Sequence, residues 1–235
     1  MRFHHLIKQG DVVTYGEMCS EEGGAALQKG MNFRLRGGLS VILMSLRTGA
    51  PYVDRVEDNG HVLIYEGHDV GHAKGGPDPK TVDQPEKNPN GSPTQNTLFF
   101  RAASKYKGGE CKPELVKVYE KVKRGIWVYN GLFRLVDAWK DRSGSRSVFK
   151  FKLELVDDES GGPIKPDIDH DRLIPSEIKA EVWKRDKGRC IICGSDDNLH
   201  FDHIIPYSKG GSSLVVENIQ LLCARHNLAK SDKIE

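Results

Sequence analysis

The stretch "CIICGSDDNLHFDHIIPYSKGGSSLVVENIQLLCARHNLAK", residues 190–230, decides the fold of the C-terminal part of the chain. It begins with a C-x-x-C pair, Cys190 and Cys193, and closes with a C-x-x-H pair, Cys223 and His226. Three thiols and one imidazole in two close pairs are a ligand set typical of tetrahedral structural zinc. A small module with little core needs such a staple. The alternative is two buried thiol pairs without a metal, and the paired spacing argues against it.

An acidic residue and an imidazole stand side by side between these pairs. Asp202 is a hard oxygen ligand, which suits a divalent cation such as magnesium or manganese. His203 is a side chain able to act as a general base at neutral pH. Adjacent side chains of an extended segment point to opposite faces, so one can hold a metal while the other faces a water molecule. Asn218 comes fifteen residues after His203, and Asn227 comes nine after Asn218.

These residues and their spacing resemble the HNH nucleases, whose site is a ββα-metal finger, over about residues 176–233. The resemblance implies that His203 deprotonates the attacking water. It implies that Asp202 and Asn227 hold one catalytic Mg²⁺ or Mn²⁺ ion, which stabilises the charge of the transition state. It also implies that Asn218 hydrogen-bonds across the loop between the two strands and keeps His203 oriented.

The role of His226 follows from two counts. The catalytic metal ligand is expected nine residues after Asn218, and that position is Asn227. The second zinc ligand of the C-x-x-H pair is expected three residues after Cys223, and that position is His226, so we assign His226 to the structural zinc. The opposite assignment would leave the zinc with only three protein ligands. Three basic residues nearby are candidates for DNA phosphate contacts, with an ordinary solvated surface as the alternative for each: Lys209, Arg225 and Lys230.

The whole chain has 235 residues and a net charge of +2, which predicts one or two domains and no general affinity for polyanions. Basic groups that bind nucleic acid would have to be clustered locally. No apolar run approaches the roughly 20 residues of a membrane span, and the N-terminus has no stretch typical of a signal peptide, so we expect a cytoplasmic protein. Cys19 and Cys111 have no partner by spacing, and we interpret them as buried free thiols.

The N-terminal part carries short runs typical of strands, and one of them alternates apolar and charged residues. The runs are "VILMSL" (41–46), "HVLIY" (61–65), "GLFRLVDAW" (131–139) and "VFKFKLELV" (148–156). They predict a twisted, mostly antiparallel sheet or barrel with flanking helices. With the zinc-stapled finger, the fold class is α+β in two domains.

We place an N-terminal domain at 1–160, a linker at 161–174 and a nuclease domain at 175–235. Gly- and Pro-rich acidic sequence marks the linker. We expect helices over 176–188, from Ser176 to Gly188, and over about 217–229. Residues 67–97 form a long loop that is either functional or a floppy insertion.

The ordered series of strand segments over most of residues 8–157 resembles the SRA domain, also called YDG, with the triplet here read as Tyr129-Asn130-Gly131. The resemblance implies a sheet that binds DNA and flips a 5-methylcytosine out of the duplex into a pocket. The pocket residues it suggests are Tyr52 and Tyr65 for stacking, Asp54 as acceptor for the base amine, and Glu66.

Alternatives remain for this pocket. Each tyrosine could instead be a sheet-core aromatic. An extra residue in "VDRVEDNG" leaves Glu57 and Asp58 as rival candidates for the pocket acid. Arg34 and Arg36 are candidates for filling the gap left by the flipped base, and lysines of the loop 67–97 could approach DNA.

A domain that binds a modified base, joined to a domain that hydrolyses phosphodiester bonds, predicts a modification-dependent restriction endonuclease. It would act on double-stranded DNA that contains 5-methylcytosine, with 5-hydroxymethylcytosine as a second candidate. Each chain has a single HNH site, so we expect a homodimer for a double-strand break. The rival hypotheses are a methyl-DNA-binding module with a structural zinc domain and an HNH nicking or homing-type enzyme that ignores modification.

Overall fold

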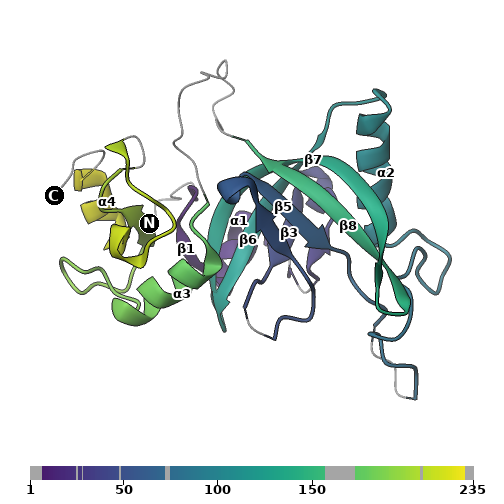
Figure 1. The fold of residues 1–235 in the computed structure, drawn as a ribbon, viewed down its shortest axis with the longest axis horizontal. Coiled ribbons are helices and arrows are strands. Elements are labelled where there is room, and N and C mark those ends of the chain that lie inside the picture. Colours follow the sequence, from purple (N-terminus) through teal and green to yellow (C-terminus); the bar gives the residue numbers. More distant parts are fainter. Residues whose placement is uncertain are drawn as a thin grey trace. The chain divides into compact units, whose positions relative to one another are not determined.

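The computed structural model describes residues 7–24, 26–27, 29–47, 49–71, 75–156, 173–206 and 209–230 (Figure 1). It divides into two compact units. Unit 1 comprises residues 1–25, 119–131 and 157–235, and unit 2 comprises residues 26–118 and 132–156. Most of the predicted linker, 161–174, lies outside the described residues, so the predicted domain boundaries stay a prediction.

Helices and strands are both well represented, which confirms the α+β class. The strands are β1 (Val12–Thr14), β2 (Met31–Asn32), β3 (Ser40–Met44), β4 (Arg55–Glu57), β5 (Val62–Glu66), β6 (Glu114–Lys123), β7 (Ile126–Ser143), β8 (Arg146–Leu155), β9 (Leu199–His203) and β10 (Ile219–Cys223). The α-helices are α1 (Tyr15–Glu21), α2 (Gln95–Lys107), α3 (Ser176–Arg185) and α4 (Ala224–Lys230), and short 3₁₀ turns lie at Leu35–Gly37, Asp58–Gly60 and Val216–Asn218. No helix of the described ranges has the length and apolar character needed to cross a membrane.

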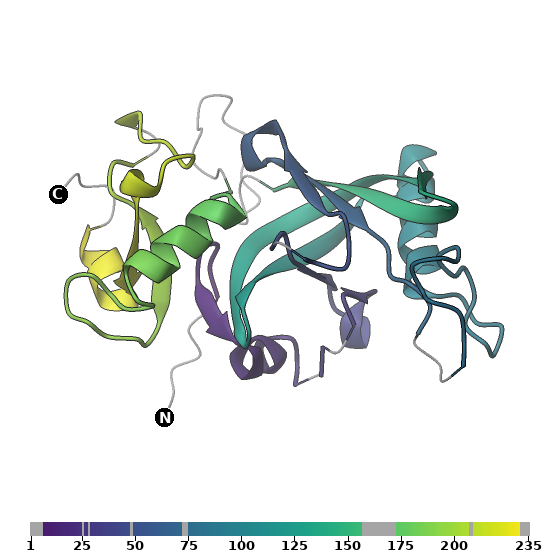
Figure 2. The same cartoon turned by 60° about the horizontal axis from the view of Figure 1, so that its bottom comes forward.

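The larger sheet has the order β2-β3-β6-β7-β8-β5-β4, with β1 paired to β7, and every pairing with a described register is antiparallel. The path is open between its two ends in the part of the chain that the structure describes. The long strands β6 and β7 each contribute residues to both units. In unit 2, β7 and β8 form a long, twisted pair (Figure 2), and the core includes Phe133, Phe151 and Leu153.

The described parts of the long loop of unit 2 are held by hydrogen bonds to the sheet. Gln84 is 4% exposed, donates from Nε2 to the Gly67 carbonyl and accepts the Phe149 N–H at 2.8 Å. Asn96, at the start of α2, accepts the His68 N–H and donates to the His68 carbonyl. These bonds favour an ordered loop over a floppy insertion.

Unit 1 contains the C-terminal finger. Its second sheet pairs β9 with β10, from Ile219 opposite His203 to Cys223 opposite Leu199, and α4 follows directly. The predicted helix at 176–188 is present as α3, which starts at Ser176 but ends at Arg185. The predicted helix at 217–229 is wrong in its first half, because the apolar run Ile219–Cys223 is a fully buried strand.

The finger shares one hydrophobic core with the other segments of unit 1. Val128 of β7 clusters with Phe201, Ile219 and Leu221, and Val12 of β1 packs against the same cluster. The Phe201 N–H donates to the Gly10 carbonyl at 3.2 Å. Strand β1 and the β6–β7 hairpin therefore complete the core beneath the finger.

Candidate HNH nuclease site

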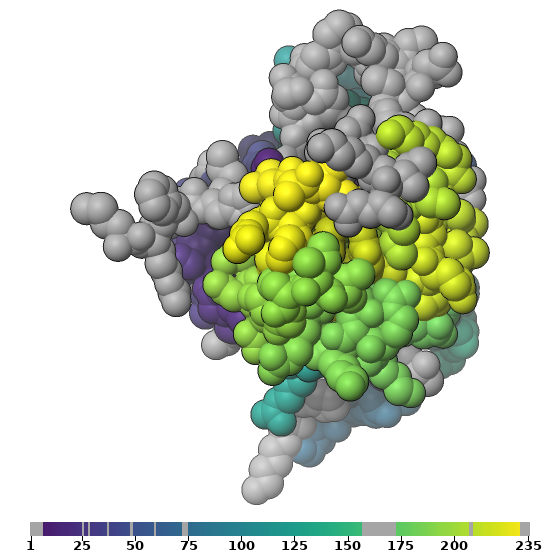
Figure 3. All heavy atoms as spheres, turned by 90° about the vertical axis from the view of Figure 1, so that its left-hand side faces the viewer, coloured from purple at the N-terminus to yellow at the C-terminus, as the bar shows by residue number. Residues whose placement is uncertain are grey.

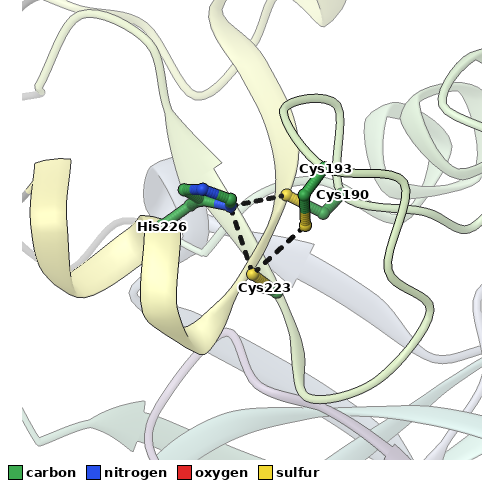
Figure 4. A group of neighbouring side chains, drawn as sticks. All are labelled: Cys190, Cys193, Cys223 and His226. Atoms are coloured by element: carbon green, nitrogen blue, oxygen red, sulfur yellow. Dashed lines mark hydrogen bonds between the residues drawn. The ribbon is translucent and has the colours of Figure 1, made fainter.

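The four predicted zinc ligands converge (Figure 4). The ligand atoms of Cys190, Cys193, Cys223 and His226 all lie within 4.8 Å of one another. His226 Nδ1 is 3.4 Å from the Cys190 sulfur and 3.3 Å from the Cys223 sulfur. Cys190 precedes β9, Cys223 ends β10 and His226 lies in the first turn of α4, so the hairpin and the helix bring the two pairs together.

The thiols of this cluster do not shift alike. The Ser195 N–H by itself lowers the pKa of Cys193, but burial and the neighbouring sulfurs of Cys190 and Cys223 together raise it, whereas the pKa of Cys190 is lowered. Burial by itself raises the pKa of Cys190, but N–H donors of Cys223, Cys193 and Ile192 and the His226 ring together lower that pKa to about 6. A thiolate is the form that binds zinc. Three sulfurs and an imidazole nitrogen at this spacing can hold a tetrahedral Zn²⁺ ion.

Asp202 and His203 lie at the end of β9. Alternation along the strand buries Leu199 and Phe201 in the core and leaves Asp202 on the other face. Asp202 Oδ2 accepts hydrogen bonds from Gln220 Nε2 at 3.0 Å and from Lys230 Nζ at 2.9 Å. Oδ1 has no hydrogen-bond partner among the described residues, which leaves one carboxylate oxygen for a cation.

His203 is held through its ring and its backbone. Its Nε2 lies 2.7 Å from the hydroxyl of Ser213, which is 2% exposed, and its carbonyl accepts from Lys230 Nζ. Burial is the largest cause that lowers the pKa of His203, while the charge of Asp202 raises it. A lowered pKa favours the neutral imidazole, which is the form that can act as a general base.

A cavity of about 160 Å³ borders both residues. Its lining includes Asp202, His203, His200, Lys179 and Asn130. His200 is paired through Nδ1 with Asp11 at 2.7 Å. The site therefore opens onto space beside the two functional side chains.

Asn218 closes the loop between β9 and β10. Its Oδ1 accepts the Ile205 N–H at 2.8 Å, and its Nδ2 donates to the carbonyls of Ile205 and Ser212 at 3.1 and 3.0 Å. A Cβ on Gly211 would lie 1.8 Å from the Ile205 carbonyl oxygen, so only glycine fits there. The loop carries Ser213 to His203, so Asn218 is linked to the imidazole only through the loop and a serine.

Ser213 was missed by sequence reasoning. It is the second serine after the pair Gly210-Gly211, and nothing in its neighbourhood separates it from an ordinary loop serine. Only the closed loop brings it to the imidazole.

Asn227 follows the zinc ligand His226 in α4 and is half-buried. Its amide makes no hydrogen bond to any described residue, so its oxygen is available. An amide oxygen and a carboxylate oxygen such as Asp202 Oδ1 are the type of donor that Mg²⁺ or Mn²⁺ prefers. Helix α4 and strand β9 pack against each other.

The three predicted phosphate contacts differ in exposure. Arg225 and Lys209 are exposed. Lys230 is only 1% exposed and is bonded inside the site, so its prediction as a phosphate contact does not fit its place in the structure.

The predicted base-pocket residues lie together in unit 2. Asp54 Oδ1 accepts the Glu66 N–H at 2.9 Å, and burial raises the pKa of Asp54 to about 7. Tyr65 is 2% exposed, and its hydroxyl donates to the Leu43 carbonyl at 3.4 Å. Tyr52 is half-buried with Lys80 Nζ 4.4 Å from its ring centroid.

Glu66 is committed to ion pairs. It is 1% exposed and accepts from Arg146 Nη2 at 3.1 Å and from Lys150 Nζ at 2.7 Å. The rival acids Glu57 and Asp58 are exposed, in contrast to Asp54.

The two arginines predicted to fill the gap in DNA lie on one turn. Arg34 and Arg36 have left-handed φ angles of 44° and 49°. Arg34 pairs with Glu114 at 2.9 Å, and Arg36 is exposed.

The finger lies on one face of unit 1, with the green and yellow segments of β9–α4 gathered there in Figure 3.

Solved structures with a similar fold include an SRA domain of SUVH5 in complex with hemimethylated CG DNA (26% identity, 67% of this chain, 94% of that chain, TM-score 0.45). Others are SUVH5 SRA bound to fully hydroxymethylated CG DNA (24%, 67%, 95%, 0.46) and the modification-dependent TagI restriction endonuclease (21%, 94%, 76%, 0.41).

No curated protein matches the sequence. Residues 190–233 match the family model described as HNH endonuclease, and this range contains the zinc cluster, Asp202, His203, Asn218 and Asn227. The chain therefore carries an HNH endonuclease module at residues 190–233.

Proposed function

We propose that the chain is a modification-dependent DNA endonuclease, which reads a modified cytosine in double-stranded DNA and hydrolyses nearby phosphodiester bonds. The observation that carries the nuclease half is the arrangement of Asp202 and His203. Asp202 has a carboxylate oxygen without a partner among the described residues, burial favours the neutral form of the His203 imidazole, and both residues border the same cavity.

The residues of the finger would divide the work as follows. In the tautomer with the proton on Nε2, His203 would donate to Ser213 and take the proton of the attacking water at Nδ1, which has no partner among the described residues. Asn218 fixes the loop that carries Ser213. Asp202 and Asn227 would hold a divalent ion, which supplies charge stabilisation to the phosphate and the leaving 3′ oxygen.

The zinc-binding cluster is assigned a structural role. Its four ligands are all protein side chains, so a bound Zn²⁺ ion would have no open position for a substrate. The catalytic ion would therefore be a separate ion, magnesium or manganese, one for each chain. A break in both strands needs two such sites, and we propose a homodimer for that step.

The reader would lie in unit 2. Cytosine presents an amine donor and a ring-nitrogen acceptor on one edge, and a carboxyl with a pKa of about 7, such as that of Asp54, can offer both an acceptor and a donor. Tyr52 is the aromatic with exposed surface for stacking, whereas Tyr65 is almost completely buried. We propose 5-methylcytosine as the base that is flipped and bound, and 5-hydroxymethylcytosine as a second substrate.

The experiment is a paired digestion. Plasmids of one sequence, carrying cytosine, 5-methylcytosine or 5-hydroxymethylcytosine, are incubated with the full chain and Mg²⁺ or Mn²⁺. We expect cleavage of modified plasmid only, and equal cutting of all three would remove the modification dependence. His203→Ala should abolish cleavage while selective binding of modified DNA persists. Selective binding without cleavage by the wild-type chain would favour a reader with a structural zinc domain.

A further inference from the structure

Lys230 is a buried cation at the centre of the nuclease site. It ends helix α4 and is 1% exposed. Its ammonium group donates to Asp202 Oδ2 at 2.9 Å and to the carbonyl of His203 at 2.5 Å. A buried lysine with two such bonds does not serve as a surface contact. One charged group therefore touches both residues on which the proposed chemistry depends.

These bonds orient the Asp202 carboxylate. Oδ2 is held from behind by Lys230 and by Gln220, which sits opposite Asp202 in β10. Oδ1 is left without a partner among the described residues, on a side chain that borders the cavity. The carboxylate can therefore bind a cation through Oδ1 while the ammonium group of Lys230 remains bonded to Oδ2.

We propose that Lys230 is a positioning residue that fixes Asp202 and His203 for catalysis and competes with the divalent ion for the charge of Asp202. The inference rests on the proposed metal site of Asp202 and Asn227. If so, the side chain of Lys230 lowers the affinity for the divalent ion and raises the rate of cleavage.

The two effects differ in sign when the charge is removed. Repulsion between an ammonium group and a divalent ion bound to the same carboxylate is equivalent to roughly tenfold or more in affinity, even in a partly hydrated site. Loss of the two bonds frees Asp202 and the end of β9, and displacement of a reacting group by about 1 Å can lower a rate by about a hundredfold. Neutralising Lys230 should therefore tighten metal binding and slow cleavage.

The experiment compares Lys230→Gln, whose shorter, neutral side chain removes the charge and cannot reproduce both bonds, with Lys230→Arg, which keeps the charge. Lys184→Gln removes an exposed lysine of α3 in the same unit and is the matched control. Mn²⁺ binding to the zinc-loaded full chain without DNA is followed through the electron paramagnetic resonance signal of free Mn²⁺. Single-turnover cleavage is measured in parallel, and zinc content and melting temperature confirm folding.

We expect Lys230→Gln to bind Mn²⁺ on the order of tenfold more tightly and to cleave at least about tenfold more slowly. Lys230→Arg should retain wild-type Mn²⁺ affinity, and Lys184→Gln should match the wild type in both. Equal or weaker Mn²⁺ binding by a folded Lys230→Gln overturns the inference. If that variant does not fold, tighter Mn²⁺ binding by Lys230→Arg overturns it and unchanged binding supports it.

Failure of the metal site itself has a different signature. Asp202→Asn should lose the Mn²⁺ site that the wild-type chain shows. If the wild type and Asp202→Asn bind Mn²⁺ equally, the proposed metal ligands are wrong and the role of Lys230 falls with them.

Discussion

A buried ion pair in unit 1 provides a quantitative test of how helix α3 is held. Lys179 of α3 is 2% exposed, and its Nζ donates to Glu120 Oε2 and to Asn130 Oδ1, both at 2.7 Å. Asn130 Nδ2 donates to the same Glu120 oxygen at 2.9 Å. Glu120 and Asn130 are each 1% exposed, so the three side chains satisfy one another away from water.

Replacing Lys179 by Met removes the cation and leaves the Glu120 carboxylate buried. Removal of one partner from such a pair costs about 3–5 kcal/mol of folding free energy. In the double variant Lys179→Met/Glu120→Gln, a neutral amide faces Asn130, and no buried charge remains. We expect the double variant to regain at least about half of the loss, roughly 2 kcal/mol.

The measurement is urea unfolding followed by tryptophan fluorescence. Trp127 and Trp183 belong to unit 1, and a Trp139→Phe background removes the signal of unit 2. A loss below about 1 kcal/mol for Lys179→Met would mean that water reaches the pair, since exposed ion pairs contribute no more than that. If the double variant is as unstable as Lys179→Met alone, the buried Glu120 carboxylate is not the cause of the destabilisation.

The ion pair of Lys179 and Glu120 also predicts how the unfolding free energy depends on pH. Burial by itself raises the pKa of Glu120, but the charge of Lys179 and its hydrogen bond outweigh burial and bring the pKa below the usual 4.5. The stabilisation is therefore present above the pKa of an unfolded glutamate and is lost as pH falls through the lower folded value. The difference in unfolding free energy between the wild type and the double variant should narrow in that acidic range.

The remaining predictions concern other sites. Because burial lowers the pKa of His203, cleavage should persist to a lower pH than an ordinary imidazole of pKa about 6.5 would allow, and a rate profile with its acid limb above that value would contradict the assignment. Ser213→Ala should slow cleavage with little change in DNA affinity, and Ser213→Thr, which keeps the hydroxyl, should recover part of the rate. Asp54, with its pKa near 7, holds a proton that the unfolded chain releases, so it opposes folding increasingly as pH rises from about 4 to 7. Asp54→Asn should accordingly melt higher than the wild type at pH 8 and equally at pH 4. Cys223→Ser should lose zinc and unfold the finger, as shown by metal analysis and by proteolysis within residues 190–230, whereas Cys111→Ser should do neither.

The sequence predicted the four-residue Cys/His cluster of the finger better than it predicted the secondary structure. These four residues are recognisable by type and spacing alone, and they do come together. The run Ile219–Cys223 was predicted as helix because a short apolar run has no periodicity that separates a buried strand from a helix. Its pairing with β9, an earlier strand of the finger, makes this run a strand.

Burial of polar side chains was the least predictable property. Lys230 was predicted as a candidate phosphate contact and Glu66 as a residue of the base pocket, yet both are 1% exposed and ion-paired. Nothing local in the sequence marks them, because their partners come from other elements: Asp202 for Lys230, and Arg146 for Glu66. The triplet residue Asn130 is a further case, since its amide serves a lysine on α3.

The position of Asn130 bears on how the nuclease is supported. The finger buries Phe201, Ile219 and Leu221 only with the help of Val128, which lies on the same β7 segment as Asn130. On a separate fragment of residues 175–235, these apolar side chains would lose that cover and Lys179 would lose both of its partners. A buried lysine without a counter-ion is strongly unfavourable, so the support must be present before the finger can hold its own core. Stability of the nuclease should then respond to substitutions at residues 119–131, which the linear sequence assigns to the reader.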